Sequence, residues 1–273
     1  MGLDAILIAD TGTDTFSGSS PLRLEMDGRE ALIQVVANCL ENGGRVVPPI
    51  EGDKKMSWKS APKFNGIFLL NYLINKEFDV KLINSFQEER GTFSRLLEEK
   101  PRALILSTTF IMSKKALREL SEDLRFLAPD VPIIAGGPFV YASYLLMNRT
   151  HEQDYDTDSA KDDFLFLDID REPPVDLYVV SRCGEQILCE VLRRIREGRA
   201  LVDIPNTATF DGRTYSFGDR VDDVSHPLEL GIDWRSLPDT LFQSGVVTMQ
   251  ASNGCPYKCA FCNFVKDRRL AFV

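Results

Sequence analysis

The chain has 273 residues, a formal net charge of −9 at pH 7 and 44% hydrophobic residues. This length predicts one or two domains, and the hydrophobic content is sufficient for a core. The acidic balance argues against a broad nucleic-acid interface, which needs clustered Lys and Arg. No apolar run approaches the ~20 residues of a membrane helix, and the start lacks the basic segment of a signal peptide. We therefore expect a cytoplasmic protein.

Up to residue 200 the chain alternates short apolar runs with amphipathic stretches. The runs predicted as strands cover residues 5–9, 80–83, 103–106, 131–135 and 176–180. The stretches predicted as helices cover residues 30–40, 64–76, 92–99, 114–127 and 185–196. This alternation predicts an α/β fold for residues 1–200, with a doubly wound, Rossmann-like or flavodoxin-like parallel sheet.

Three further segments have their own patterns. Residues 149–175 are rich in Asp and predict a solvated loop, in which residues 164–167 could form a short strand; the ligand spacing of an EF-hand calcium loop is absent. Residues 201–245 predict a connector with a hairpin at the Asp211-Gly212 turn. Residues 246–250 predict an apolar strand that opens the last segment, 246–273.

Polar and glycine residues follow three of the predicted strands. Ligands of open α/β sheets bind outside the carboxyl ends of the strands, where the strand order reverses. A flavodoxin-like order would line that crevice with three loops: Asp10, Thr11 and Gly12; Ser107, Thr108 and Thr109; Gly136 and Gly137. The paired glycines allow close approach of a ligand to the backbone. A tight turn without a ligand is the other interpretation.

Three cysteines near the end of the chain, Cys255, Cys259 and Cys262, have the spacing Cys-x3-Cys-x2-Cys. Thiolate sulfur is a soft ligand that suits iron–sulfur clusters or zinc. Three ligands are one fewer than a closed site needs, so one coordination position stays open. The alternatives are a zinc knuckle with His226 or Cys183 as fourth ligand, or three ordinary cysteines.

The cysteine spacing, with Gly254 and Pro256 around the first cysteine and Phe261 before the third, resembles the radical S-adenosylmethionine (SAM) superfamily. The resemblance implies that the three cysteines hold a 4Fe–4S cluster. It also implies that the fourth iron binds SAM, with Phe261 near the adenine. A reductant such as flavodoxin or ferredoxin would then drive formation of a 5′-deoxyadenosyl radical.

Residues 104–109 and 132–138 look like the cobalamin-binding domain that precedes the cysteines in one class of this superfamily. The resemblance implies that the loops at Ser107–Thr109 and Gly136–Gly137 contact the nucleotide tail of cobalamin. The chain departs from the class in lacking Asp-x-His-x-x-Gly, so the usual lower axial histidine is absent. The Gly-Glu-x-Glu stretch of the class reads Arg182-Cys183-Gly184-Glu185 here.

The resemblance therefore implies the N-terminal part of a cobalamin-dependent radical SAM enzyme. It would catalyse methyl transfer, or radical rearrangement or ring formation, on a small molecule or peptide. The alternatives are a non-catalytic corrinoid-binding or partner-binding module, and a radical SAM protein whose Rossmann domain binds no corrin. No catalytic side chain can be assembled around His151 and His226, the two histidines of the chain.

The position of the cysteines leads to one more expectation. The resembled family places them at the start of a partial (β/α) barrel, and the chain ends 11 residues after Cys262. Five further βα units need on the order of 150 residues. We therefore expect an incomplete barrel that is inactive by itself, with a second chain completing the barrel as a candidate partner.

Overall fold

The structure is a computed structural model that describes residues 2–12, 25–26, 29–30, 62–152, 158, 160–169, 172–222, 231–242, 252–253 and 271–272. Within these residues no helix is long and apolar enough to cross a membrane. The predicted strand at 246–250 lies outside them, as does the predicted helix at 30–40 apart from Glu30, which ends β3. Two small antiparallel pairs join β2 (Glu25–Met26) to β3 (Arg29–Glu30) and β10 (Ser252–Asn253) to β11 (Ala271–Phe272).

A seven-stranded sheet forms the centre of the fold, in the order β4-β1-β5-β6-β7-β8-β9. Its parallel strands are β4 (Val80–Ile83), β1 (Ala5–Ile8), β5 (Leu104–Ser107), β6 (Ile133–Gly136) and β7 (Leu177–Val179). Because the first strand lies between the second and third parallel strands along the chain, the order is flavodoxin-like. The predicted α/β fold class is confirmed.

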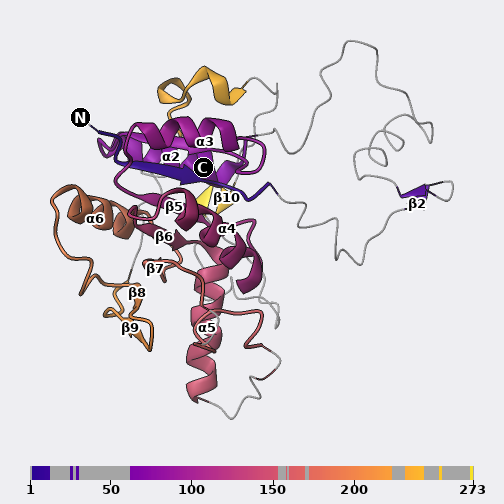
Figure 1. Cartoon of the computed structure of the whole chain (residues 1–273), viewed down its shortest axis with the longest axis vertical. Helices are drawn as coiled ribbons and strands as arrows, with labels where there is room; N and C mark the ends of the chain where they lie inside the picture. The colour runs from indigo at the N-terminus through magenta and orange to yellow at the C-terminus, as the bar shows by residue number, and fades with distance from the viewer. Residues whose placement is uncertain are drawn as a thin grey trace.

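Helices cover both faces of the sheet (Figure 1). They are α2 (Phe64–Asn75), α3 (Arg90–Glu98), α4 (Lys114–Leu127), α5 (Pro138–Glu152) and α6 (Glu185–Arg196). In β1, Ile6 and Ile8 pack in the core that includes α3, α4 and α5, whereas Ala5 and Leu7 pack in the core that includes α2 and α6. Alternate side chains of a strand point to opposite faces of the sheet. Because helices bury both faces here, consecutive residues of a central strand must be apolar, which explains the uninterrupted apolar runs of the sequence.

The connector adds two antiparallel strands to the sheet. The predicted hairpin is confirmed as β8 (Thr207–Phe210) and β9 (Tyr215–Phe217), and β8 pairs with β7. The turn is held by the Asp211 carboxylate, which accepts backbone N–H bonds from Arg213 and Thr214, both at 2.8 Å. Gly212 supplies the positive φ of 90° that the turn needs.

Residues 231–242 return to the other side of the molecule and lie against α2 (Figure 1). They contain the short helices η2 (Trp234–Ser236) and η3 (Asp239–Phe242). The buried Asn71 side chain of α2 donates to the Asp233 carbonyl at 3.2 Å and to Ser236 Oγ at 2.9 Å, and it accepts from the Asp233 N–H. Leu237 is buried in the same core. The connector is therefore fixed to α2 by both polar and apolar contacts.

The prediction of a strand at residues 164–167 is wrong: these residues form turns. Phe166 adopts a φ of +69°, in the left-handed region that strands do not use. Its buried ring contacts Tyr215 at 4.8 Å and Tyr178 at 5.3 Å between centroids, both edge to face. This part of the acidic insertion is thus packed against β7 and the hairpin rather than solvated throughout.

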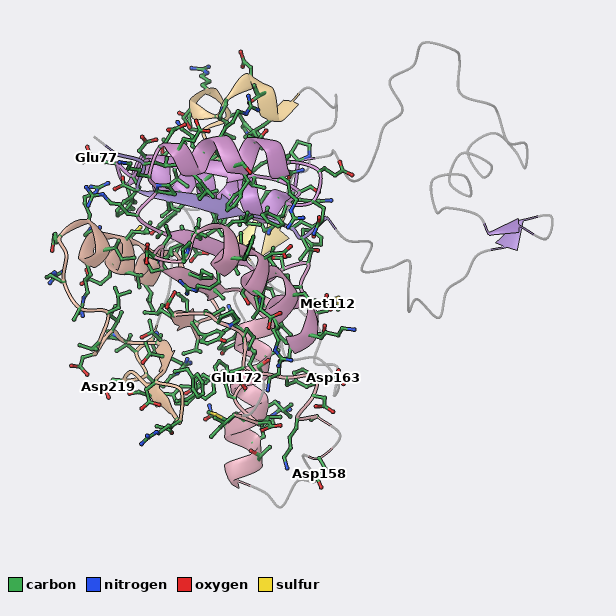
Figure 2. The ribbon with its side chains drawn as sticks, in the orientation of Figure 1. Glu77, Met112, Asp158, Asp163, Glu172 and Asp219 are labelled. Atoms are coloured by element: carbon green, nitrogen blue, oxygen red, sulfur yellow. The ribbon has the colours of Figure 1, made fainter. Side chains whose placement is uncertain are left out.

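A buried ion pair ties the insertion to α4. Lys114 Nζ lies 2.8 Å from Glu172 Oε1, and both side chains are 2% exposed. Lys114 Nζ also donates to the Asp168 carbonyl at 2.8 Å, and Tyr215 donates its hydroxyl hydrogen to Glu172. Burial raises the pKa of Glu172, while the bonds from Lys114 and Tyr215 act in the opposite direction. Figure 2 shows Glu172 among the side chains around α5, whereas Asp158 lies at the periphery.

Replacing Lys114 with Met should remove about 3–5 kcal/mol from the free energy of unfolding, because the Glu172 carboxylate stays buried without its cation. Urea denaturation measures this loss. The neighbouring Lys115→Met is the matched control: its side chain is 80% exposed, and the change should stay within about 0.5 kcal/mol. Equal effects of the two variants would contradict the structural role of the pair.

Candidate functional site

A cavity of about 170 Å³ lies at the carboxyl ends of β5, β6 and β7. Helix α2 and the first turns of α5 and α6 complete its wall. The lining residues are Asn65, Phe68, Leu69, Ile105, Leu106, Ser107, Thr109, Gly136, Gly137, Pro138, Val179, Ser181, Arg182, Gly184, Glu185 and Leu188. Pockets that enclose a whole drug-sized ligand usually measure about 300–1,000 Å³. This cavity therefore has room for one part of a larger ligand.

Asn65, in the first turn of α2, bridges the ends of two strands. Its side-chain amide donates to the Ala9 carbonyl at 2.9 Å, directly after β1, and to Ser107 Oγ at 2.8 Å, the last residue of β5. Ser107 Oγ and Thr109 Oγ1 share a further hydrogen bond of 3.2 Å. The crevice predicted between β1 and β5 is thus crossed by the Asn65 side chain, and the cavity lies on the β5 side of it.

Two glycines at the end of β6, Gly136 and Gly137, allow the neighbouring backbone segments to pack closely beside the cavity. Gly137 has a φ of +115°, and a Cβ there would lie 3.0 Å from Thr108 Oγ1. Thr108 donates its backbone N–H and its hydroxyl hydrogen to the Gly136 carbonyl, at 2.8 and 3.0 Å. A Cβ on Gly136 would lie 3.2 Å from Val179 Cβ, on the neighbouring strand. Gly136 and Gly137 therefore allow the loop after β5 and the strand β7 to pack closely at this end of the sheet.

The loop between β7 and α6 forms the opposite wall. Gly184 is the N-cap residue of α6, and as a glycine it has no side chain to cap the helix. A Cβ on Gly184 would lie 2.6 Å from Val179 Cγ1, so the helix start packs closely against β7. Ser181 Oγ accepts from the Cys183 N–H at 3.2 Å. Arg182 and Glu185 also line the cavity, and Arg182 is exposed. The backbone N–H groups at this helix start and the Arg182 guanidinium favour negatively charged ligand groups, whereas the Glu185 carboxylate in the first turn of α6 opposes them.

The predicted site residues are brought together only in part. Ser107, Thr109, Gly136 and Gly137 line the cavity, and Thr108 supports Gly137 from behind. Asp10, Thr11 and Gly12 are not among the lining residues; Asp10 Oδ2 lies 3.6 Å from Lys63 Nζ, and Gly12 N–H donates to Asp10 Oδ1. The lining residues from α2 and α6, such as Asn65 and Leu188, were not predicted, because they do not lie at the carboxyl end of a strand.

The three cysteines of the motif and Phe261 lie outside the described residues, as does His226. Of the other cysteines, Cys183 and Cys189 take part in no disulfide within the described residues. Burial raises the pKa of Cys189 to about 11. In the described part of the chain, no group of three or more His, Cys, Asp or Glu side chains could hold a metal ion.

Comparison with solved structures gives an α/β fold of the same type as the one described above. The chain is similar to the radical SAM methyltransferase TsrM from Kitasatospora setae, solved with cobalamin and a [4Fe–4S] cluster bound, with a TM-score of 0.51 and 16% identity over 99% of this chain. A second structure of TsrM, with tryptophan substrate and the SAM analog aza-SAM, gives a TM-score of 0.49 and 16% identity over 98% of this chain.

The chain covers 43% of each TsrM chain. At 16% identity the similarity shows a shared fold. No protein-family model matches the sequence, and no curated protein matches it.

Replacing Gly137 with Ala should lower the free energy of unfolding by at least about 1 kcal/mol, because the residue has a positive φ and its new Cβ would meet Thr108. Gly91→Ala is the matched control. Gly91 lies in α3 with open space around it, so Ala should stabilise the helix by about 0.5 kcal/mol. Chemical denaturation measures the free energy of unfolding of both variants, which should fall in Gly137→Ala and rise in Gly91→Ala.

Proposed function

We propose that this chain is the cofactor-binding part of a cobalamin-dependent radical SAM enzyme that transfers methyl groups. The observation that carries the proposal is the cavity at the carboxyl ends of β5–β7, lined by Ser107, Thr109, Gly136 and Gly137. These are residues that the resemblance to the cobalamin-binding class assigns to the nucleotide tail. The fold shared with TsrM, a methyltransferase solved with cobalamin bound, supports the same assignment.

The residues present fit the nucleotide tail of a corrinoid. Gly136 and Gly184 let the ends of β6 and α6 pack closely against Val179, where a Cβ would lie 3.2 Å from Val179 Cβ and 2.6 Å from Val179 Cγ1. Phe68, Leu69, Ile105 and Leu188 contribute apolar wall for an aromatic base. Arg182 offers positive charge and the start of α6 offers N–H donors to a phosphate, which the Glu185 carboxylate in the same turn partly offsets. The cavity would hold the tail, and the corrin ring would lie outside it.

The second half of the proposal concerns Cys255, Cys259 and Cys262. We propose that they ligate a 4Fe–4S cluster, with Phe261 beside the adenine of SAM. The chemistry that these cofactors supply when bound is one-electron cleavage of SAM and carriage of a methyl group on cobalt. The external electron donor would be a small redox protein of the flavodoxin or ferredoxin type. In this part of the chain the protein's own contribution is to bind and orient the cofactors.

Cobalamin should bind to the purified chain, and Leu69→Trp should weaken that binding at least ten-fold because the indole ring fills the cavity. Equilibrium dialysis with cobalamin measures both affinities. Leu96→Trp is the matched control, since Leu96 is a partly buried leucine of α3 that does not line the cavity. Absence of cobalamin binding to the unchanged chain would refute the corrinoid part of the proposal and favour a Rossmann domain without a corrin.

Anaerobic reconstitution with iron and sulfide should load a cluster that is lost when Cys255, Cys259 and Cys262 are all replaced by Ala. The readout is iron and acid-labile sulfide per chain. Cys189→Ala is the control, because this thiol is buried in the core that includes α6. Undiminished iron and sulfide in the triple variant would contradict the ligand assignment, and zinc lost on Cys183→Ala would favour the zinc knuckle.

A further inference from the structure

The chain directly after the β8–β9 hairpin returns to the segment that precedes β8. A Cβ on Gly218 would lie 2.0 Å from the Ile204 carbonyl oxygen, so only glycine fits at this approach. The Asn206 N–H donates to the Asp219 carbonyl at 2.9 Å, and Asp219 is labelled beside the hairpin in Figure 2. The returning segment, residues 218–221, is therefore packed closely against the residues before β8.

Asn206 joins this returning segment to the end of β7. Its side-chain amide donates to the Val221 carbonyl at 2.8 Å, and its side-chain oxygen accepts from the Val221 N–H at 3.2 Å. Its backbone carbonyl accepts from the Val180 N–H at 2.9 Å. Asn206 is 1% exposed and has a φ of +54°, in the left-handed region where asparagine is enriched. Each backbone and side-chain polar atom of this buried residue thus has a partner.

Arg220 binds the other backbone polar group of Val180. Its Nη1 donates to the Val180 carbonyl at 2.7 Å, and its guanidinium lies over the Tyr144 ring of α5, 5.1 Å from the centroid. Val180 is 1% exposed, so its carbonyl needs a partner within the protein. Asn206 and Arg220 together hold the N–H and the C=O of Val180. We call these two residues the Val180 clamp.

The clamp lies directly before one wall of the cavity. Val180 follows the last residue of β7, and the chain leaves the sheet there. The next residues, Ser181, Arg182 and Gly184, line the cavity, whereas neither residue of the clamp does. A loop that already has its bound conformation loses less freedom when a ligand binds. The clamp can therefore act on a ligand only through the loop that it holds.

We propose that Asn206 and Arg220 are positioning residues of the cavity, which hold residues 181–184 in the conformation that a bound ligand meets. This inference rests on the proposed corrinoid function and gives a role to two residues outside the cavity. The bond from Arg220 to Val180 spans 40 residues of the chain. It ties the connector to the wall of the cavity.

The first test needs no ligand and measures amide hydrogen exchange. Arg220→Met lacks the donor to Val180, so exchange at residues 181–184 should become about five-fold or more faster. In Arg220→Lys the ammonium group can donate to the Val180 carbonyl, and most of the protection should return. Exchange of the buried strand Ala5–Ile8, followed in the same experiment, should stay slow because the fold is retained.

The matched control is Arg213→Met. Arg213 is an exposed arginine at the turn of the same hairpin, and its replacement should leave exchange at residues 181–184 unchanged. Unchanged exchange there in Arg220→Met, or equal exchange in Arg220→Met and Arg213→Met, overturns the inference.

Asn206→Gly tests whether the two residues act as one unit. The variant keeps the positive φ accessible but loses both side-chain bonds to Val221. Because Val221 follows Arg220, the guanidinium should lose its fixed position over Val180. Asn206→Gly combined with Arg220→Met should then exchange at residues 181–184 no more than about two-fold faster than Arg220→Met alone. Fully additive effects overturn the joint clamp.

The last test measures the affinity of the 273-residue chain for cobalamin by equilibrium dialysis. Arg220→Met should bind roughly five-fold more weakly, whereas Arg220→Lys and Arg213→Met should stay within about two-fold of the unchanged chain. Equal affinity in Arg220→Met despite faster exchange overturns the effect of the loop on the ligand and leaves the proposed function in place. Failure of the unchanged chain to bind cobalamin overturns the proposed function and this effect with it, while the exchange rates still decide whether the clamp orders the loop.

Discussion

The hydrogen bonds of Asn65 are the constraint on which the arrangement of the site depends. In a flavodoxin-like sheet, the first and third parallel strands leave α-helical connections on opposite faces, and a gap opens between their carboxyl ends. Here the Asn65 amide spans that gap, from the Ala9 carbonyl to Ser107 Oγ. Because the Asn65 side chain fills this gap, the cavity lies instead at the ends of β5, β6 and β7. There Gly136, Gly137 and Gly184 allow close packing of the backbone.

Helix α2 connects this site with the chain that leads towards the cysteines. Its first half carries Asn65, Phe68 and Leu69 at the cavity, and its second half carries Asn71, which binds residues 233–236. One rigid element therefore positions both the proposed corrinoid pocket and the connector. Packing of Leu237 in the core that includes α2 and α6 adds an apolar contact to these hydrogen bonds. A fixed connector is what a two-cofactor enzyme needs, because its reacting groups must be held in register.

The sequence predicted the elements with strong periodicity and missed those that depend on distant partners. Leu117, Leu120 and Leu124 recur on one face, and α4 has the predicted bounds. Helix α5 was not predicted, since its buried residues, such as Val140 and Tyr144, follow a glycine pair and lack a clear apolar stripe. The turn at Phe166 was mistaken for a strand because its positive φ follows from packing against Tyr178 and Tyr215, which lie elsewhere in the sequence.

For the site, the loops after β5 and β6 were predicted from their position at strand ends, whereas the role of Asn65 depends on contacts over 42 and 56 residues.

The place of β1 in the sheet has a consequence for how the chain assembles. About 70 residues separate β1 from β4, its first partner, whereas about 25 separate β5 from β6, so closing the longer loop costs about 1 kcal/mol more. We expect β5 and β6 to pair early, with β1 inserted later. Strand β1 precedes the other strands of this sheet in the sequence. Its run Ala5–Ile8, fully buried in the native sheet, would then stay unpaired and open to aggregation until the later strands have formed.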